Sequence, residues 1–210
     1  MGLDELRRAV IEGDQKAARE LATLELDAGT APECILQEGL IAAMDEVGRL
    51  FECGKLYVPE MLIAARAMQG ALGLLRPHLI ATCVPAAGKV VIGAVKGDLH
   101  DIGKNLVAMM LEGAGFEVVD LGTDVSPDRF VAAVDDKTNL VAMSALLTTT
   151  MPAMKATLDA LIQAGVRSRV KVIVGGAPLT QEYADKIGAD GYAEAASSAA
   201  RLARALLSLP

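Results

Sequence analysis

The run KVVIGAVKGDLHDIGKNLVAMMLEGAG, residues 89–115, has the clearest pattern of secondary structure in this sequence. It opens with a β-branched apolar run, 89–95, which is typical of a strand buried on both faces. It closes with apolar residues at helical spacing, and a polar loop, 96–103, joins the two. A strand, a loop and a helix in this order form the first unit of a parallel α/β sheet. Because such sheets bind ligands at the edge where loops follow strands, we expect a ligand site in this loop.

His100 lies in this loop between two acidic residues, Asp98 and Asp101. A carboxylate beside an imidazole can hold one ring nitrogen and leave the other free to bind a metal. A surface loop with an idle histidine and a helix cap at Asp101 explains the spacing equally well. A P-loop has four residues between its glycines, whereas Gly97 and Gly103 enclose five, and the dinucleotide pattern GxGxxG is absent. The phosphate-binding loops are therefore poor interpretations.

The run of residues 98–103, DLHDIG, resembles the DxHxxG motif of cobalamin-binding domains. It is most similar to the motif of methionine synthase and of corrinoid proteins in methyltransferase systems of the methanol, methylamine and O-demethylase type. The resemblance implies a cobalamin or related corrinoid as cofactor, in its methylcobalamin form, with His100 as the lower ligand of cobalt. It implies that Asp98 supports the histidine. The loop residues implied to bind the cofactor are Gly97, Asp98, Leu99, His100, Asp101, Ile102 and Gly103.

A later segment, SALLTTT at residues 144–150, resembles the serine–threonine stretch of the same family. That stretch lines the slot for the nucleotide tail of the cofactor, so the resemblance implies tail contacts from Ser144 and Thr148, and it also implies that Leu146 binds the cofactor. Thr150 takes the position of a serine that extends the histidine–aspartate network in methionine synthase. A strand end followed by a helix cap is the alternative interpretation.

Two further matches are shorter. Gly175 and Gly176 correspond to a glycine pair beside the nucleotide in the family, although a tight turn alone would also use them. Ala196 resembles the last family contact, at a position where small residues are common. Both segments follow predicted strands, so they are expected at the same edge of the sheet as His100.

Residues 1–82 are predicted to form helices only. Asp14 is expected to cap the second helix, and Thr30 with Glu33 has the pattern of a capping box before the third. Four helices with short connections predict a four-helix bundle.

Residues 38–68 resemble the helical cap that precedes the cobalamin domain in this family. The cap covers the reactive upper face of the corrin, and an apolar cover keeps water and oxygen away from it. Packing inside the bundle is the alternative role for its apolar residues. The residues that correspond to the family's contacts are Phe51, Val58 and Met61.

Residues 83–88 form the predicted linker to a cobalamin-binding α/β domain at 89–210. This part alternates strands with helices that start near Asp101, Ser126, Thr150, Leu179 and Glu194. Five such units predict a flavodoxin-like (Rossmann-like) parallel sheet with strand order 2-1-3-4-5 and helices on both faces. The expected strands are 89–95, 117–121, 140–144, 171–174 and 191–193.

The composition excludes some functions. The chain has 210 residues, a net charge of −7 and 3% aromatic residues, which argues against nucleic-acid binding. Its three cysteines are too few and too scattered for a disulfide framework or a zinc site and fit a reducing cytoplasm. No signal-peptide core and no uninterrupted apolar helix are apparent, so we expect a cytoplasmic protein that does not enter the membrane.

The resemblance implies a methyl carrier of one-carbon metabolism that is not catalytic alone. A substrate-specific methyltransferase would load it, and a second one would pass the methyl group to tetrahydrofolate or coenzyme M. A reductive activase is a further candidate partner. Three alternatives stay open. A cobalamin-dependent mutase subunit would need the upper face of the cofactor open, and a cobalamin sensor would need a DNA-binding segment. The third alternative is a protein that stores the corrinoid. The methyl donor, the corrinoid variant and the oligomeric state stay open.

Overall fold

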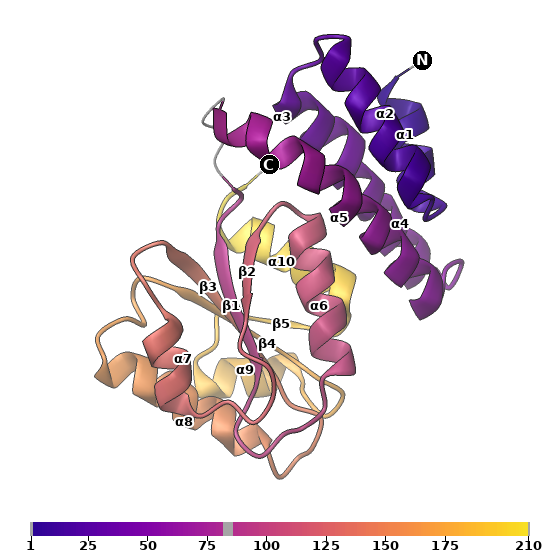
Figure 1. Ribbon diagram of the computed structural model, residues 1–210. Coiled ribbons are helices and arrows are strands. Elements are labelled where there is room, and N and C mark those ends of the chain that lie inside the picture. Colours follow the sequence, from indigo (N-terminus) through magenta and orange to yellow (C-terminus); the bar gives the residue numbers. More distant parts are fainter. Residues whose placement is uncertain (1, 82–85, 210) are drawn as a thin grey trace. The chain divides into compact units, whose positions relative to one another are not determined.

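The structure is a computed structural model that describes residues 2–81 and 86–209 (Figure 1). The chain divides into two compact units, each of which is described separately below. One unit comprises Met1–Ala86 with Glu112–Gly115, and the other comprises Ala87–Leu111 with Phe116–Pro210. The predicted linker, 83–88, falls partly on residues 83–85, which lie outside the described part of the chain.

The first unit consists of helices, as predicted. Its third helix is continuous from Pro32 to Glu52 and has a π-helical segment in its middle. Across the described residues, no helix is both long and apolar enough to span a membrane. The elements of this unit are α1 (Leu3–Ile11), α2 (Gln15–Asp27), α3 (Pro32–Cys34), η1 (Ile35–Ile41), α4 (Ala42–Glu52) and α5 (Val58–Ala81).

One predicted cap is confirmed and the other is wrong. The Asp14 side chain accepts a hydrogen bond from the backbone N–H of Ala17 and caps α2. The Thr30 hydroxyl instead donates to Glu25, 2.7 Å away, so the capping box does not form. The physical reason is Pro32, whose fixed φ and missing N–H make it the first helical residue. The N-cap position then falls one residue after Thr30.

The π segment was not predicted. Its buried residues are spaced five apart, Ile35 with Leu40 and Leu36 with Ile41, as suits a helix with i→i+5 hydrogen bonds. Gly39 lies against Leu6 of α1, because a Cβ at this glycine would be 2.8 Å from Cδ2 of the leucine. The wider turn therefore presents four apolar side chains and a close helix contact to the interior of the unit.

The second unit is a five-stranded parallel sheet with the order β2-β1-β3-β4-β5, which confirms the predicted fold class and strand order. Element ends differ from prediction by one or two residues, as for α9, which starts at Gln181 because the Thr180 hydroxyl caps it. The elements are β1 (Lys89–Ala94), α6 (Ile102–Gly113), β2 (Glu117–Asp120), α7 (Pro127–Ala133), β3 (Thr138–Ser144), α8 (Met151–Gln163), β4 (Lys171–Gly175), α9 (Gln181–Ile187), β5 (Gly191–Ala193) and α10 (Ala196–Leu206).

Helices cover both faces of this sheet, with α6 and α10 on one face and α7, α8 and α9 on the other (Figure 1). The second face holds a large apolar core in which Phe130 of α7 packs with residues of β1, β3 and β4. A Cβ at Gly93 would lie 2.9 Å from Cζ of Phe130, so β1 needs a glycine there. Because the strands lie between two layers of helices, both of their faces are buried, which explains the continuous apolar runs in the sequence.

The register of the sheet aligns the ends of four strands. Ala94 pairs with Ser144, Ser144 with Gly175, and Gly175 with Ala193. Because the strands are parallel, the loops that follow them leave the same edge of the sheet side by side. These loops carry the residues singled out in the α/β part of the sequence.

Candidate functional site

Asp98 is the centre of the site. It lies in the loop after β1, and its side chain is fully buried. Its Oδ1 accepts hydrogen bonds from the backbone N–H of His100 at 3.0 Å and from Nδ1 of the same residue at 2.8 Å. Its Oδ2 accepts from the backbone N–H of Leu146 and from the Thr150 hydroxyl, both at 2.7 Å. The loops after β1 and β3 therefore meet on one carboxylate.

The hydrogen bonds keep this carboxylate charged. Burial opposes ionisation of Asp98, but the donors on Leu146, His100 and Thr150 outweigh it and hold the pKa of Asp98 well below its usual range. An ionised, fully hydrogen-bonded carboxylate is a fixed acceptor for the imidazole beside it. Its orientation is set by two backbone N–H groups and two side-chain donors.

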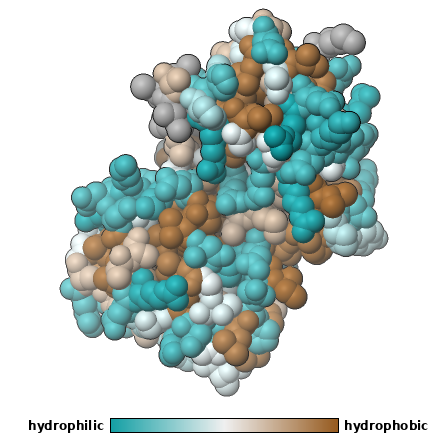
Figure 2. Space-filling model, in the orientation of Figure 1, coloured by the Kyte–Doolittle hydropathy of each residue, from teal (hydrophilic) through white to brown (hydrophobic). Residues whose placement is uncertain are grey.

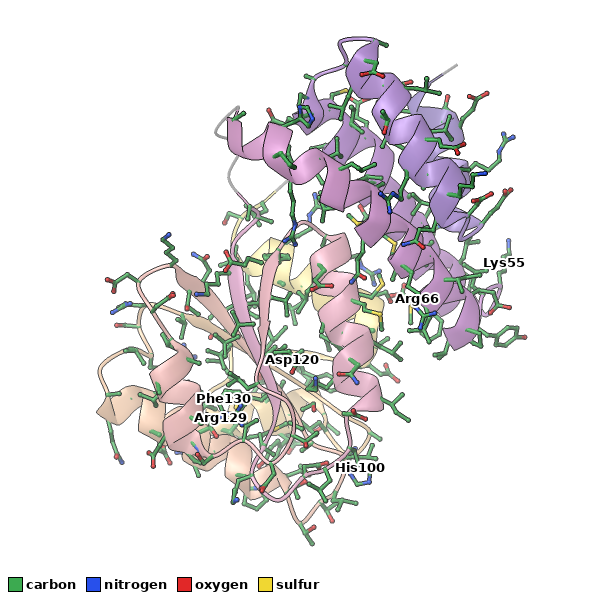
Figure 3. All side chains as sticks on the ribbon, in the orientation of Figure 1. Lys55, Arg66, His100, Asp120, Arg129 and Phe130 are labelled. Atoms are coloured by element: carbon green, nitrogen blue, oxygen red, sulfur yellow. The ribbon has the colours of Figure 1, made fainter. Side chains whose placement is uncertain are left out.

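His100 is held at one ring nitrogen and open at the other. With Nδ1–H donated to Asp98, the lone pair is on Nε2, to which no described residue offers a hydrogen bond. The side chain is 48% exposed, and Figure 3 labels it at the end of the α/β unit where the loops emerge. An imidazole oriented in this way can donate Nε2 to a metal, with the aspartate as its outer partner.

Exposed apolar side chains lie next to this histidine in the chain and also occur in the loop after β3. Leu99 and Ile102 are 73% and 74% exposed, and Leu146 and Leu147 are also exposed. Brown, hydrophobic atoms are visible at this end of the unit in Figure 2. Leu147 is an addition to the predicted residues, and the signal for it was its position next to Leu146 in the segment 144–150. Such a group of exposed apolar residues is typical of a ligand surface.

Gly103 leaves open space beside these residues. A Cβ there would meet no atom within 4 Å, and the residue lies in the first turn of α6, where glycine is unfavourable. The chain's own packing therefore does not require glycine at this position. The open nitrogen of His100 can hold a metal, and the exposed apolar side chains and the open space at Gly103 suit a flat, bulky ligand beside it.

The residues expected to hold the nucleotide tail lie at neighbouring strand ends. Ser144 ends β3 and pairs with Gly175 at the end of β4, Thr148 is exposed in the loop after β3, and Ala196 begins α10. Gly176 has φ +137°, and a Cβ there would be 1.9 Å from the Ala145 carbonyl oxygen. The chain's own packing is thus sufficient to explain this second glycine.

Asp101 and Lys104 organise the start of α6. The Asp101 carbonyl accepts from the backbone N–H of Asn105 at 2.7 Å, and its Oδ2 accepts from the side chain of the same residue. Lys104 is 2% exposed, and its ammonium contacts Asp120 at the end of β2 and Oδ1 of Asn105. Lys104 and Asp120 were not predicted; the one available signal was a charged residue between the apolar positions of an expected helix.

The residues predicted to contact the upper face of the cofactor belong to the helical unit. Phe51 lies near the end of α4, and Val58 and Met61 lie in the first turns of α5. Met61 is buried, whereas the other two are partly exposed. Their contact with a cofactor stays a prediction.

Two family models match the chain. Both are described as a B12 binding domain, and they match residues 88–201 and residues 3–76. Together they span both units of the structure.

Curated relatives match over nearly the full length. The chain is 46% identical over 206 residues to dimethylamine corrinoid protein 3 of Methanosarcina acetivorans, which covers 98% of this chain and 96% of that protein. It is 43% identical over 206 residues to the trimethylamine corrinoid protein of Methanosarcina barkeri, with 97% and 95% covered.

Solved structures match as well. A chain in the crystal structure of the methanol:cobalamin methyltransferase complex from Methanosarcina barkeri gives a TM-score of 0.84 at 30% identity, covering 98% of this chain and 79% of that chain. A cobalamin-binding protein from Desulfitobacterium hafniense gives a TM-score of 0.83 at 30% identity, with 98% of both chains covered.

Proposed function

The chain belongs to the family of B12-binding corrinoid proteins of methyltransferase systems, and from this we propose that it carries a methyl group between two partner methyltransferases. Membership in this family gives it a cobalamin-type corrinoid as cofactor. When bound, the corrinoid supplies a cobalt atom that can accept and release a methyl group. The protein's own residues then bind the cofactor, orient the cobalt ligand and shield the site.

We propose that His100 is the lower cobalt ligand, in a histidine-on state. The observation that carries this proposal is the contact between its Nδ1 and the buried carboxylate of Asp98, which directs the lone pair to Nε2. Thr150 donates to the other oxygen of the carboxylate and fixes its plane.

Beyond the cobalt ligand, apolar side chains would contact the cofactor, and open space would let it approach the protein closely. The exposed side chains of Leu99, Ile102, Leu146 and Leu147 are suited to one face of the macrocycle, and the open space at Gly103 lets the ring approach the start of α6. The loop residues Gly97 and Asp101 complete this surface. The strand-end residues proposed for the nucleotide tail are Ser144, Thr148, Gly175, Gly176 and Ala196.

For the helical unit we propose the role of an apolar cover. Phe51, Val58 and Met61 are the residues that correspond to the family's upper-face contacts. An apolar cover excludes water and oxygen while the cofactor is in a reactive state, and it has to open when a partner exchanges the methyl group.

The proposed partners follow from the names of two relatives. The names of two relatives specify dimethylamine and trimethylamine, and we propose a methylamine as the methyl donor, processed by a donor-specific methyltransferase. A second methyltransferase would take the methyl group to tetrahydrofolate or coenzyme M. A reductive activase would return the cofactor to its active oxidation state.

The test of the ligand proposal is the visible spectrum of the protein reconstituted with methylcobalamin, before and after acidification. We expect a spectrum of cofactor detached from its own base and ligated by histidine, which acid converts to an unligated one. In His100→Ala, the bound cofactor should show the unligated spectrum at neutral pH. His78→Ala is the matched control and should behave as wild type, since His78 lies in the last turn of α5, away from Val58 and Met61 in its first turns.

Two results would contradict the proposal. Cofactor that does not co-elute with the wild-type protein would remove the carrier function. An unchanged spectrum of cofactor bound to His100→Ala would remove the ligand assignment and leave the carrier function intact.

A further inference from the structure

Asp124 has an unusual backbone conformation beside the histidine loop. Its φ is +52°, and apart from Ser208 no other non-glycine residue in the described ranges has a positive φ. Aspartate tolerates this left-handed region better than most residues, but it is still an uncommon state that the surrounding contacts must maintain. Val125, the next residue, forms a parallel bridge with Val95 beyond the end of β1. The segment therefore leaves β2, bends, and rejoins the strand that leads to Asp98.

The contacts of Asp124 hold three consecutive residues of the histidine loop. Its Oδ1 accepts a hydrogen bond from the backbone N–H of Gly97 at 2.8 Å, and its carboxylate forms an ion pair with the Lys96 ammonium at 3.0 Å. Its own backbone N–H donates to the carbonyl oxygen of Asp98 at 2.9 Å. No other side chain in the described part of the chain binds this stretch of backbone from outside the loop.

These contacts restrain the position of the Asp98 side chain. The peptide groups on both sides of Asp98 are held, because its N–H donates to Val95 and its carbonyl accepts from Asp124. Gly97 itself has φ +83°, so this part of the loop has no regular secondary structure of its own to keep it in place. A small rotation of the loop would move the Asp98 carboxylate away from Leu146 and Thr150, and His100 with it.

We propose that Asp124 is a positioning residue for His100: by holding Gly97 and Asp98 from the neighbouring loop, it keeps the imidazole in the orientation in which Nε2 binds cobalt. The inference rests on the proposed function, since it concerns the same ligand. It adds a residue from the loop after β2, outside the DLHDIG motif and outside the segments that resembled the family. The essential contact is the hydrogen bond to Gly97, and the ion pair with Lys96 is secondary because both of its side chains are largely exposed.

The variants separate these contributions. Asp124→Gly removes the carboxylate but adopts the positive φ without strain and keeps the N–H that binds Asp98. Asp124→Asn keeps a side-chain oxygen for Gly97 and loses only the charge. Lys96→Met breaks the ion pair alone. The matched control is Asp135→Ala, which removes a carboxylate that likewise accepts a backbone N–H and pairs with a lysine, but before β3, at the opposite edge of the sheet.

The first measurement is the electron paramagnetic resonance spectrum of each protein, labelled with 15N-histidine and loaded with cob(II)alamin. A histidine on cobalt splits the lines into doublets, whereas the cofactor's own 14N base splits them into triplets. We expect full doublet signals in wild type, Asp124→Asn, Lys96→Met and Asp135→Ala. In Asp124→Gly we expect a reduced doublet fraction and cobalamin binding weakened about tenfold, as for the loss of one hydrogen bond to a charged group.

The second measurement is hydrogen exchange of the Gly97 amide without cofactor. We expect exchange about tenfold faster in Asp124→Gly than in wild type, while Asp124→Asn restores protection. Thermal unfolding midpoints of all variants are measured as well. A midpoint equal to that of wild type shows that faster exchange at Gly97 is a local change.

The outcomes are distinct. A wild-type protein without a doublet overturns the proposed ligand and this inference with it. If wild type shows the doublet, a full doublet with wild-type affinity in Asp124→Gly overturns the inference alone. Equal losses in Asp124→Asn and Asp124→Gly would also overturn it, because the retained oxygen would then be irrelevant.

Discussion

At the scale of the residue, the site depends on one buried charge. Asp98 is fully buried and accepts four hydrogen bonds, and these bonds favour its ionised form over the neutral one. Such an arrangement ties the stability of the fold to the same carboxylate that orients the candidate metal ligand.

Replacing Asp98 should therefore change how stability depends on pH. The folded-state pKa of Asp98 is depressed, so its contribution is complete above the unfolded-state pKa of about 4 and is lost as pH falls toward the folded value. We expect Asp98→Asn to lower the free energy of unfolding by about 3 kcal/mol at pH 7, because one amide oxygen cannot accept all four bonds. The difference from wild type should shrink by pH 3.

Urea unfolding at both pH values measures this effect. Asp101→Asn is the control, since Asp101 is exposed and its carboxylate accepts one hydrogen bond, from Asn105. A difference between Asp98→Asn and wild type that is the same at pH 3 and pH 7 would show that the charge of Asp98 contributes nothing.

Two glycines at the site should respond in opposite ways to alanine. Gly176→Ala brings a Cβ to 1.9 Å from the Ala145 carbonyl oxygen at a positive φ, so we expect destabilisation of about 3 kcal/mol or more. Gly103→Ala meets open space in a helix and should gain up to about 1 kcal/mol while weakening cobalamin binding.

Thermal unfolding and a cobalamin titration measure both changes. Gly73→Ala on α5, which also meets open space, is the control for a helical glycine away from the site and should leave binding unchanged. Unchanged cobalamin affinity in Gly103→Ala would mean that the cofactor does not approach the start of α6.

At the scale of the element, an ion pair between a buried lysine and a partly exposed aspartate joins α6 to β2. Lys104 is 2% exposed, whereas its partner Asp120 is 40% exposed and also accepts a hydrogen bond from the backbone N–H of Gly122. Removing Asp120 should therefore have a different effect on stability from removing Lys104. A free Asp120 can hydrate, but a free Lys104 ammonium cannot.

We expect Asp120→Ala to destabilise the protein by about 3 kcal/mol and Lys104→Met by about 1 kcal/mol or less. Chemical unfolding monitored by circular dichroism gives both values. Asp159→Ala is the control, because it breaks the exposed Lys155–Asp159 pair on α8 and should change stability by less than about 0.5 kcal/mol. Equal losses of stability in Asp120→Ala and Lys104→Met would contradict this prediction, because burial of the lysine would then have no energetic consequence.

At the scale of the whole molecule, a helical unit and a parallel sheet share one chain, and both match models of a B12 binding domain. A ligand that binds only the folded state adds to its stability by mass action. We expect cobalamin at about one hundred times its dissociation constant to raise the free energy of unfolding by about 2.7 kcal/mol.

Thermal scans at increasing cobalamin concentration measure this shift. His100→Ala is the comparison, and its midpoint should rise less at the same concentrations. A midpoint that does not depend on cobalamin in the wild-type protein would contradict binding to the folded state.

Much of the architecture could be predicted from local patterns. Alternating apolar runs and helical periods predicted the fold class, the flavodoxin-like type of sheet supplied the strand order, and Asp14 predicted one helix start. Local patterns failed where a nearby residue changed the register, as when Pro32 moved the start of a helix past Thr30. The π turn was missed because its spacing of five deviates from the ordinary helical period.

By itself, then, the sequence determined a parallel α/β unit after a helical one, and a loop with Asp98 and His100 at the ligand-binding edge of the sheet. Only the tertiary structure decided which groups surround that loop. The Leu146 amide comes from 48 residues away and Asp124 comes from the loop after β2, whereas the Thr150 hydroxyl, 52 residues away, was already expected from the resemblance to the family. The physical reason is that these contacts depend on the register of hydrogen bonds between parallel strands, which is set by packing across the whole sheet and leaves no local pattern in the chain.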